Sequence, residues 1–388
     1  MKKLIFGYGV TGKSVEEYFQ KSNISYLIYD ENKELNVPSD LVFESSMISE
    51  IDEVIISPGV KPSNSLLEQI KSIDKPVITD IDIFNNIYKG KIIGITGTNG
   101  KTTFVNLLSG FLNAQGSKSI GVGNIGKSPL EIVDKEFDYI VLELSSFQLH
   151  YINKLDLFMG VILNIYEDHL DWHSDFDEYV NTKKRIKEFV NEENVVENFL
   201  NSSDNNNFHK EYDLSKLPFY ENTSEMFLKV IESLNFHKST AYEFLLNSKT
   251  DEHRFEKVDE FNDILFINDS KSTNFNSVSM ATKNIKNGIL IMHGLTKNIS
   301  TKDLKIYDGV KTILIPKDMD VNFCNLDIEI IKLDSIFNLK ENLLKVINPG
   351  DTVLFSCGGA SFNDFKNYEE RGRFFKNIVL DIKEEING

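Results

Sequence analysis

The 388-residue sequence has few cysteines, few basic side chains and no long apolar run. Its two cysteines, Cys324 and Cys357, provide no disulfide framework, which is typical of a protein from a reducing cytosol. No apolar run approaches the roughly 20 residues that span a bilayer. The apolar start is broken by Gly7 and Gly9, too early for a signal peptide. Acidic side chains outnumber basic ones by 59 to 42, and this net charge of −17 argues against a general nucleic-acid binder. We therefore expect a cytoplasmic protein without membrane or nucleic-acid partners.

The alternation of apolar runs with helical stretches predicts α/β domains with parallel or mixed sheets. We expect a Rossmann-like domain at residues 1–90, a central P-loop ATPase-like domain at 91–250 and a Rossmann-like domain at 251–388. Residues 191–207 are rich in Asn, Glu and Ser, so we interpret 190–250 as a reduced, partly loop-like end of the central domain. The predicted strands are residues 3–6, 25–29, 53–56, 139–142, 158–163, 264–267, 289–292, 312–315 and 352–355.

The first predicted strand is followed by a glycine-rich turn. Gly7-x-Gly9-x-x-Gly12, with Asp30 at 18 positions after Gly12, has the outline of a dinucleotide-binding fingerprint. The same spacing also serves tight turns and sites for other nucleotides. The residues alone leave these alternatives open.

The most informative motif is Gly94-Ile95-Thr96-Gly97-Thr98-Asn99-Gly100-Lys101-Thr102-Thr103, which lies between an apolar run and a helix-spaced segment. A strand, a glycine loop, Lys-Thr and a helix together form a cradle for polyphosphate, because backbone N–H groups and the helix N-terminus face the anion. Lys101 can neutralise phosphate charge, and the Thr102 hydroxyl can join a Mg²⁺ shell. The spacing departs from the generic motif, since Ile95 stands five residues before the Gly-Lys pair.

Polar side chains close the next two apolar strands. Glu143 and His169 would meet at the edge that holds the phosphate loop if the strands are parallel, and with Thr102 they could bind Mg²⁺. Lys183 lies in the run Thr182-Lys183-Lys184-Arg185, which by itself indicates a solvated basic face.

Taken together, these residues resemble the Mur ligases, the ATP-dependent amide-bond formers of peptidoglycan synthesis. The resemblance extends from residue 3 to about residue 375, with a gap at 190–250. Besides the phosphate loop it rests on four stretches: Gly7-Tyr8-Gly9-Val10-Thr11-Gly12, Leu142-Glu143-Leu144-Ser145-Ser146-Phe147-Gln148-Leu149, Asn268-Asp269-Ser270-Lys271-Ser272-Thr273-Asn274, and Ser361-Phe362-x-Asp364-Phe365-Lys366-x-Tyr368-x-x-Arg371-Gly372.

The resemblance implies a monomer that uses ATP and two Mg²⁺ ions to join D-glutamate to UDP-N-acetylmuramoyl-L-alanine through an acyl phosphate. The implied catalytic residues are Lys101, Glu143, His169 and Lys183. The implied metal ligands are Thr102, Glu143, His169 and Lys183, the last as a carbamate. The implied ATP contacts are Gly97, Thr98, Asn99, Gly100, Lys101, Thr102, Thr103, Arg254, Asp269 and Lys271. UDP-substrate contacts would be Val10, Thr11, Asp30, Glu31, Gly59, Asn124, Ser145 and Gln148, and D-glutamate contacts Thr273, Lys297, Ser361 and Tyr368.

Three positions depart from the family pattern. The adenine-side Asn falls at Lys238, His293-Gly294 replaces the Gly-Gly before Lys297, and Tyr368 replaces a Phe. Alternatives within the family are ligases for other amino acids or dipeptides, and folylpolyglutamate synthase. Outside it, a nicotinamide-dependent oxidoreductase would leave the Gly100-Lys101-Thr102 loop without a function, and a non-catalytic ATP-binding regulator would not need Glu143 and His169.

Overall fold

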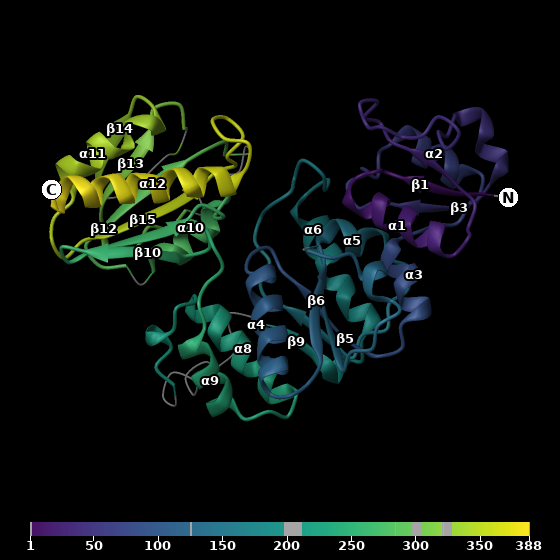
Figure 1. The fold of residues 1–388 in the computed structure, drawn as a ribbon, viewed down its shortest axis with the longest axis horizontal. Coiled ribbons are helices and arrows are strands. Elements are labelled where there is room, and N and C mark those ends of the chain that lie inside the picture. Colours follow the sequence, from purple (N-terminus) through teal and green to yellow (C-terminus); the bar gives the residue numbers. More distant parts are fainter. Residues whose placement is uncertain are drawn as a thin grey trace. The chain divides into compact units, whose positions relative to one another are not determined.

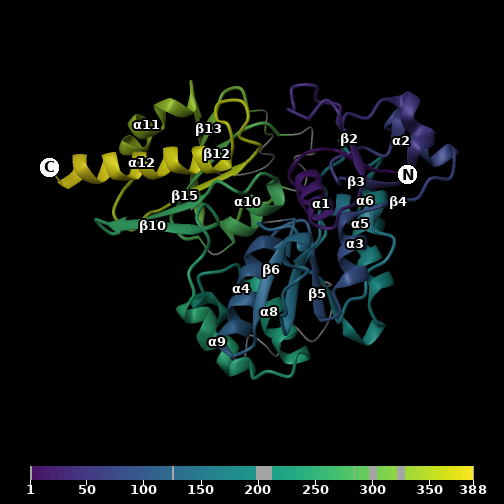
Figure 2. The same cartoon turned by 45° about the vertical axis from the view of Figure 1, so that its right-hand side comes forward.

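In the computed structural model, the chain forms three mainly parallel sheets in sequence order, each accompanied by helices (Figures 1 and 2). The structure describes residues 2–124, 126–197, 212–283, 285–296, 304–319, 321 and 328–387. These residues fall into two compact units. The first holds the first two sheets and includes Lys229–Phe236, and the second holds the third sheet. The predicted α/β class is confirmed, whereas the predicted domain boundaries remain a prediction.

The first sheet has the order β2-β1-β3-β4, and all its neighbouring strands are parallel. Ile28, Ile5 and Ile55 are register partners across three strands and are each at most 1% exposed. A row of branched apolar side chains is typical of a parallel strand that is buried on both faces. The elements are β1 (Lys2–Phe6), α1 (Val10–Lys21), β2 (Tyr26–Tyr29), β3 (Ile51–Ile56), α2 (Ser65–Ser72), β4 (Val77–Ile78) and α3 (Asp80–Ile87).

The second sheet has the order β6-β7-β5-β8-β9 and is parallel throughout. The phosphate-loop strand β5 therefore lies between the strands that end in Glu143 and in the loop to His169. This neighbourhood confirms the parallel arrangement on which the site prediction depended. The elements are β5 (Lys91–Thr96), α4 (Lys101–Ala114), β6 (Ser119–Gly123), β7 (Tyr139–Glu143), α5 (Ser146–Tyr151), β8 (Met159–Ile162), α6 (Phe176–Lys184) and β9 (Val195–Glu197).

The segment at 190–250, interpreted from the sequence as partly loop-like, also holds helices that the sequence analysis did not predict. Two helices lie there, α8 (Glu221–Ser233) and α9 (Lys238–Asn247). Met226, Phe227, Val230 and Ile231 give α8 a buried apolar face at helical spacing. The Asn-rich stretch that suggested irregular structure lies mostly outside the described residues.

The third sheet has the order β10-β11-β15-β12-β13-β14, in which only the pairing of β10 with β11 is antiparallel. Ile267, Leu354, Leu290 and Ile313 form one buried row across four strands. The elements are β10 (Glu256–Phe261), β11 (Ile264–Asp269), α10 (Phe275–Thr282), β12 (Gly288–His293), β13 (Val310–Pro316), β14 (Glu329–Leu333), α11 (Leu339–Val346), β15 (Thr352–Gly358) and α12 (Tyr368–Asn387).

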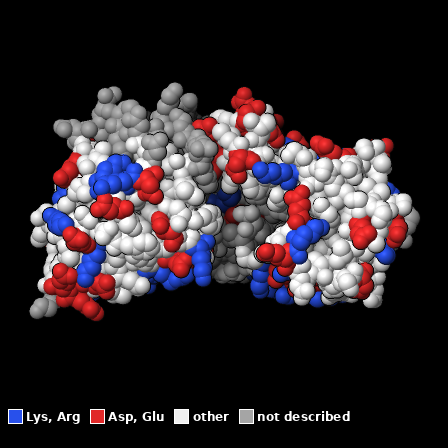
Figure 3. All heavy atoms as spheres, turned by 90° about the horizontal axis from the view of Figure 1, so that it is seen from above, with Lys and Arg blue, Asp and Glu red and all other residues white. Residues whose placement is uncertain are grey.

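Among the described residues, no helix is long and apolar enough to cross a membrane. On the face shown in Figure 3, acidic and basic side chains are interspersed.

Candidate active site

The phosphate loop lies between β5 and α4, as the sequence predicted. Gly100 caps the helix with φ +82°, a left-handed conformation that favours glycine. Lys101 opens α4, and its Nζ donates to the carbonyl oxygens of Gly97 (2.8 Å) and Thr98 (3.0 Å). The N-terminus of a 14-residue helix and the ammonium group of Lys101 therefore lie together at this loop.

The loop after β8 holds the phosphate loop in this shape. The Thr98 amide donates to the Asn164 carbonyl oxygen (3.0 Å), and the Asn99 amide donates to the Asn164 side chain (2.9 Å). The Tyr166 amide donates to the Thr98 hydroxyl (2.9 Å), which also contacts the Tyr179 hydroxyl (2.9 Å). Thr98 and Asn99, predicted as nucleotide contacts, are thus fixed before any ligand arrives.

Glu143 has the properties of a metal ligand. It ends β7, is 1% exposed, and accepts a hydrogen bond from Asn124 Nδ2 on Oε1 (2.9 Å). Its Oε2 is buried and has no hydrogen-bond partner among the described residues. Because an ionised oxygen left unpaired in the interior is costly, this atom fits a Mg²⁺ ion, which prefers oxygen ligands.

His169 lies in the loop after β8, at φ +56°, which is rare for a residue with a Cβ. The rings of Phe147 and His169 pack together with their centroids 4.8 Å apart, and His169 Nε2 is 3.8 Å from Asp168 Oδ2. Asp168 is only 5% exposed and also accepts the His169 amide (2.9 Å). This carboxylate was not predicted as a site residue, although it directly precedes the predicted histidine.

Lys183 is not on a solvated basic face, since it is 1% exposed while its neighbour Lys184 is exposed. Its Nζ donates to the Gly97 carbonyl oxygen (2.9 Å), the same atom that accepts from Lys101. Burial, and then the charge of Lys101, hold the pKa of the Lys183 amine well below its usual range. The structure therefore brings Lys183 to the phosphate loop, as the family resemblance implied.

Three further predicted substrate contacts lie beside Glu143. Asn124 binds the carboxylate, and Ser145 and Gln148 form a capping box at the start of α5. The Ser145 hydroxyl donates to Gln148 Oε1 (3.1 Å), and the Gln148 amide donates to the Ser145 hydroxyl (3.2 Å). These two side chains thus also have a local structural role.

The other five predicted UDP-substrate residues lie at the carboxyl ends of the first sheet. Asp30, which follows β2, accepts the Tyr8 amide of the glycine loop (2.6 Å). Glu31 accepts from Asn64 Nδ2 (2.6 Å), and Val10 is 78% exposed at the start of α1. Thr11 is in that helix, and Gly59 is in the turn after β3.

In the second unit, Asp269 ends β11 and is 4% exposed. It accepts hydrogen bonds from the Tyr220 hydroxyl (2.9 Å), the Ser356 hydroxyl (2.9 Å) and the Phe255 amide (3.0 Å). Burial raises the pKa of this carboxyl to about 7 against the lowering effect of those donors.

Lys271 and Tyr368 come together, with the ammonium 4.1 Å from the ring centroid. Burial raises the pKa of the Tyr368 hydroxyl, and the charge of Arg254 opposes this rise. Thr273 precedes the Asn274 cap of α10, and Ser361 is buried after β15. Lys297 and Cys324 lie outside the described residues.

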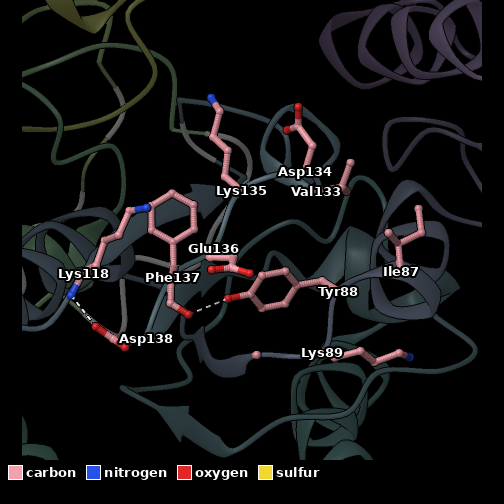
Figure 4. Close-up of a pocket in the computed structure, with 11 residues that line it drawn as sticks. Ile87, Tyr88, Lys89, Lys118, Val133, Asp134, Lys135, Glu136, Phe137 and Asp138 are labelled. Carbon is pink, nitrogen blue, oxygen red and sulfur yellow. Dashed lines mark hydrogen bonds between the residues drawn. The ribbon is translucent and has the colours of Figure 1, made fainter.

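A pocket of about 640 Å³ lies at the opposite, amino-terminal ends of β5, β6 and β7 (Figure 4). Tyr88 donates to the Phe137 carbonyl oxygen (3.0 Å), and Lys118 Nζ lies 5.1 Å from the Phe137 ring centroid. Lysines and carboxylates alternate in its lining, so no single ligand charge is favoured. None of the predicted site residues lines it.

Comparisons with known proteins find similar sequences over the whole chain. Residues 1–79 match the N-terminal domain of MurD-like Mur ligases, and residues 95–287 match the Mur ligase middle domain. A UDP-N-acetylmuramoylalanine–D-glutamate ligase of Thermosipho africanus (strain TCF52B) is 30% identical over 421 aligned residues, which cover 99% of each sequence. A ligase of the same name from Buchnera aphidicola subsp. Schizaphis graminum (strain Sg) is 32% identical, over 100% of this chain and 98% of the relative.

Solved structures share the fold. The MurF ligase of Thermotoga maritima in complex with ADP aligns with a TM-score of 0.58 at 16% identity, over 98% of this chain and 95% of that one. A pseudomurein peptide ligase type C from Methanothermus fervidus aligns with a TM-score of 0.55 at 17% identity, over 98% of this chain and 100% of that one. Full-length identity to curated relatives, together with the domain matches, shows that this chain belongs to the Mur ligase family.

Proposed function

We propose that the chain is an ATP-dependent ligase that joins D-glutamate to UDP-N-acetylmuramoyl-L-alanine in peptidoglycan precursor synthesis. The observation that carries the chemistry is the cluster at the phosphate loop. Two lysines, Lys101 and Lys183, donate to one carbonyl oxygen, and the same sheet edge carries Glu143, with its unpaired buried oxygen. Full-length relatives named for D-glutamate ligation support the choice of substrate.

The reaction we propose has two steps. The substrate carboxylate attacks the γ-phosphate of ATP, giving an acyl phosphate and ADP, and the amine of D-glutamate then displaces phosphate. The first step brings two anions together. Two unit charges 4 Å apart interact by about 1 kcal/mol in water but by about 4 kcal/mol at an effective dielectric near 20. Lys101 and the N-terminus of α4 offset this repulsion where the phosphates would lie.

The residues present fit bound Mg²⁺. Glu143, His169 and Thr102 would hold it, and it would supply charge neutralisation at the phosphate oxygens. We further propose that Lys183 acts as a carbamate. The neutral Lys183 amine would add to carbon dioxide and release a proton to solvent, and burial favours that neutral form of Lys183. The chain's residues then bind and orient the reactants, while the bridge from the Asn164 loop to Asn99 keeps the phosphate loop rigid.

Phosphate release with each candidate amino acid tests the proposal. With UDP-N-acetylmuramoyl-L-alanine and ATP, we expect release with D-glutamate and not with L-alanine, L-glutamate or a diamino acid. Release with another amino acid would assign a different Mur ligase activity, and release with a folate substrate would assign the folylpolyglutamate synthase alternative. Hydride transfer with a nicotinamide cofactor would contradict the ligase function. We propose a cytoplasmic monomer that needs no membrane or nucleic acid. Sedimentation of the purified chain measures its mass in solution and so tests the monomeric state.

A further inference from the structure

Arg371, in the first turn of α12, is fully buried and has no carboxylate within ion-pair distance among the described residues. Its Nε donates to the Ser270 hydroxyl (3.0 Å) and its Nη2 to the Ser270 carbonyl oxygen (2.7 Å). Its Nη1 donates to the carbonyl oxygens of His293 (3.0 Å) and Gly359 (2.9 Å). These carbonyl oxygens lie at the carboxyl ends of β11, β12 and β15, which are adjacent in the third sheet. The guanidinium group of Arg371 therefore links the ends of three neighbouring strands by hydrogen bonds.

The loops after β12 and β15 also pair directly. The Leu295 amide donates to the Ala360 carbonyl oxygen, and the Ala360 amide to the Leu295 carbonyl oxygen, both at 2.8 Å. Gly294 lies at φ +116°, and a Cβ there would be 2.3 Å from the Ala360 oxygen and 2.8 Å from Arg371 Nη1. Only glycine permits this close crossing.

His293 is the residue where the sequence departs from the Gly-Gly pattern. It is 0% exposed, and its two ring nitrogens face Arg371 Nη1 (3.3 Å) and Asp364 Oδ2 (2.8 Å). A guanidinium group can only donate, so Nδ1 accepts, the proton resides on Nε2, and Nε2 donates to Asp364. Burial lowers the pKa of His293, in keeping with this neutral tautomer.

Asp364 belongs to the turn that begins at Ser361. The amides of Asp364 (3.3 Å) and Phe365 (3.0 Å) both donate to the Ser361 carbonyl oxygen. The Phe365 ring packs against His293 with centroids 5.5 Å apart. Anchoring the Asp364 carboxylate therefore fixes the turn that presents Ser361.

We propose that Arg371, His293 and Asp364 form a positioning relay that holds the Ser361 turn in the shape needed by the amino-acid substrate. The inference rests on the proposed function to the extent that Ser361 contacts D-glutamate. None of the three relay residues is assigned a contact with substrate. The imidazole occupies a position where the family pattern has glycine, so the relay is a feature of this chain beyond that pattern.

The test compares Asp364→Ala, Asp364→Asn and His293→Phe in the full-length protein, with Asp334→Ala as the matched control. Asp334 is an exposed aspartate of the same unit that pairs with Lys317. Steady-state phosphate release gives KM for D-glutamate, ATP and the UDP-substrate separately. We expect Asp364→Ala to raise KM for D-glutamate about tenfold while the other two KM values stay within about twofold, as for a lost charge-assisted hydrogen bond. Asp364→Asn, whose amide oxygen still accepts from Nε2, should retain most of the wild-type affinity.

The effects of the His293 and Asp364 substitutions on KM for D-glutamate should also be non-additive. His293→Phe combined with Asp364→Ala should raise KM for D-glutamate no further than His293→Phe alone, because the histidine substitution already removes the hydrogen bond to Asp364. If His293→Phe does not fold, Asp364→Ala still tests the relay. The Asp364 side chain is one-third exposed, so we expect its substitution to leave the fold intact. An unchanged KM for D-glutamate in Asp364→Ala would overturn the relay.

Amide hydrogen exchange of the free protein separates this inference from the proposed function. Exchange at residues 361–365 should be faster in Asp364→Ala than in wild type and near normal in Asp364→Asn and Asp334→Ala. A raised KM without faster exchange would point to direct substrate contact and overturn the positioning role. If the wild type uses another amino acid, the proposed function fails, and the relay is judged on KM for that amino acid and on exchange.

Discussion

A single buried amine illustrates how the fold changes residue chemistry. Lys183 would be an ordinary surface cation with a pKa near 10.4 if it were exposed, as its neighbour Lys184 is. Burial and the Lys101 ammonium both disfavour its charged form. Glu143 and Asp168 act in the opposite direction, but they do not outweigh burial. The resulting amine suits carbamate formation, and the sequence run alone gave no sign of this.

Lys183→Ala should be nearly inactive in phosphate release, because the proposed carbamate ligand is lost. Added short carboxylates should partly restore activity by taking the place of the carbamate. Lys184→Ala, one residue away and exposed, is the control and should keep wild-type activity. An unrescued Lys183→Ala variant with full activity would show that Lys183 has no catalytic role.

Lys101→Ala should lose about 10²–10³ in kcat, because the removed charge stabilises the transferred phosphate rather than the core. Thermal unfolding should stay near that of the wild type, because the Lys101 ammonium donates to the carbonyl oxygens of Gly97 and Thr98 in its own loop. Lys118→Ala, at the amino-terminal edge of the same sheet, serves as the control (Figure 4). Near-normal turnover by the Lys101 variant would contradict the phosphate-loop assignment.

At the scale of elements, α3 begins with a buried charge. Asp80 is 3% exposed, and its Oδ1 has no hydrogen-bond partner among the described residues. Burial raises the pKa of this carboxyl to about 6, while the backbone amides of the first turn lower it only in part. The adjacent Thr79–Asp82 capping box secures the helix start without help from Asp80.

The raised pKa of Asp80 makes stability depend on pH. The folded state holds this proton more tightly than the unfolded chain, so the stabilisation is complete below about pH 4 and is lost as pH rises through about 6. Asp80→Asn should remove this dependence and raise the free energy of unfolding at pH 7 by about 1–3 kcal/mol. Urea unfolding of wild type and variant at pH 5 and pH 7 measures the free energy of unfolding, and Asp40→Asn is the control because Asp40 is exposed. An Asn variant that is no more stable at pH 7 would show that Asp80 is not penalised by burial.

Periodicity predicted most strands because each is a short apolar run buried on both faces, as the row through Ile267 and Leu290 shows. It missed α8, since the polar stretch before it dominated the interpretation. Local motifs predicted Lys101, Glu143 and His169, because Glu143 ends a strand and the other two follow neighbouring strands within a few residues. The partners of Arg371 could not be predicted in this way, because Ser270, His293 and Gly359 meet only when three strands are aligned.

At the scale of the whole molecule, each sheet carries predicted ligand residues at its carboxyl ends, with the ATP contacts divided between the second and third sheets and the D-glutamate contacts Ser361 and Tyr368 at the third. Asp30 lies at the carboxyl ends of the first sheet and Lys101 at those of the second. Asp269 and Ser361 lie at those of the third. Parallel strands place the loops that follow them at one edge of a sheet, which is where all these predicted residues lie. Substitution of a predicted D-glutamate contact should therefore change KM for D-glutamate more than KM for ATP or for the UDP-substrate.

Lys297→Met is the strictest test of this division, although Lys297 lies outside the described residues. The family resemblance assigns its charge to a glutamate carboxylate, and an anion left without its cation binds poorly. KM for D-glutamate should therefore rise about tenfold or more, while KM for ATP and for the UDP-substrate changes little. Wild type and variant are assayed with D-glutamate, L-glutamate and L-alanine, and Lys311→Met is the control because that lysine pairs with Asp351 at the opposite edge of the third sheet. If the variant keeps its affinity for D-glutamate, the assignment of the amino-acid pocket to the third sheet is wrong. The ligase function would stand even then, because it depends on the phosphate loop, Glu143 and Lys183, which lie around the second sheet.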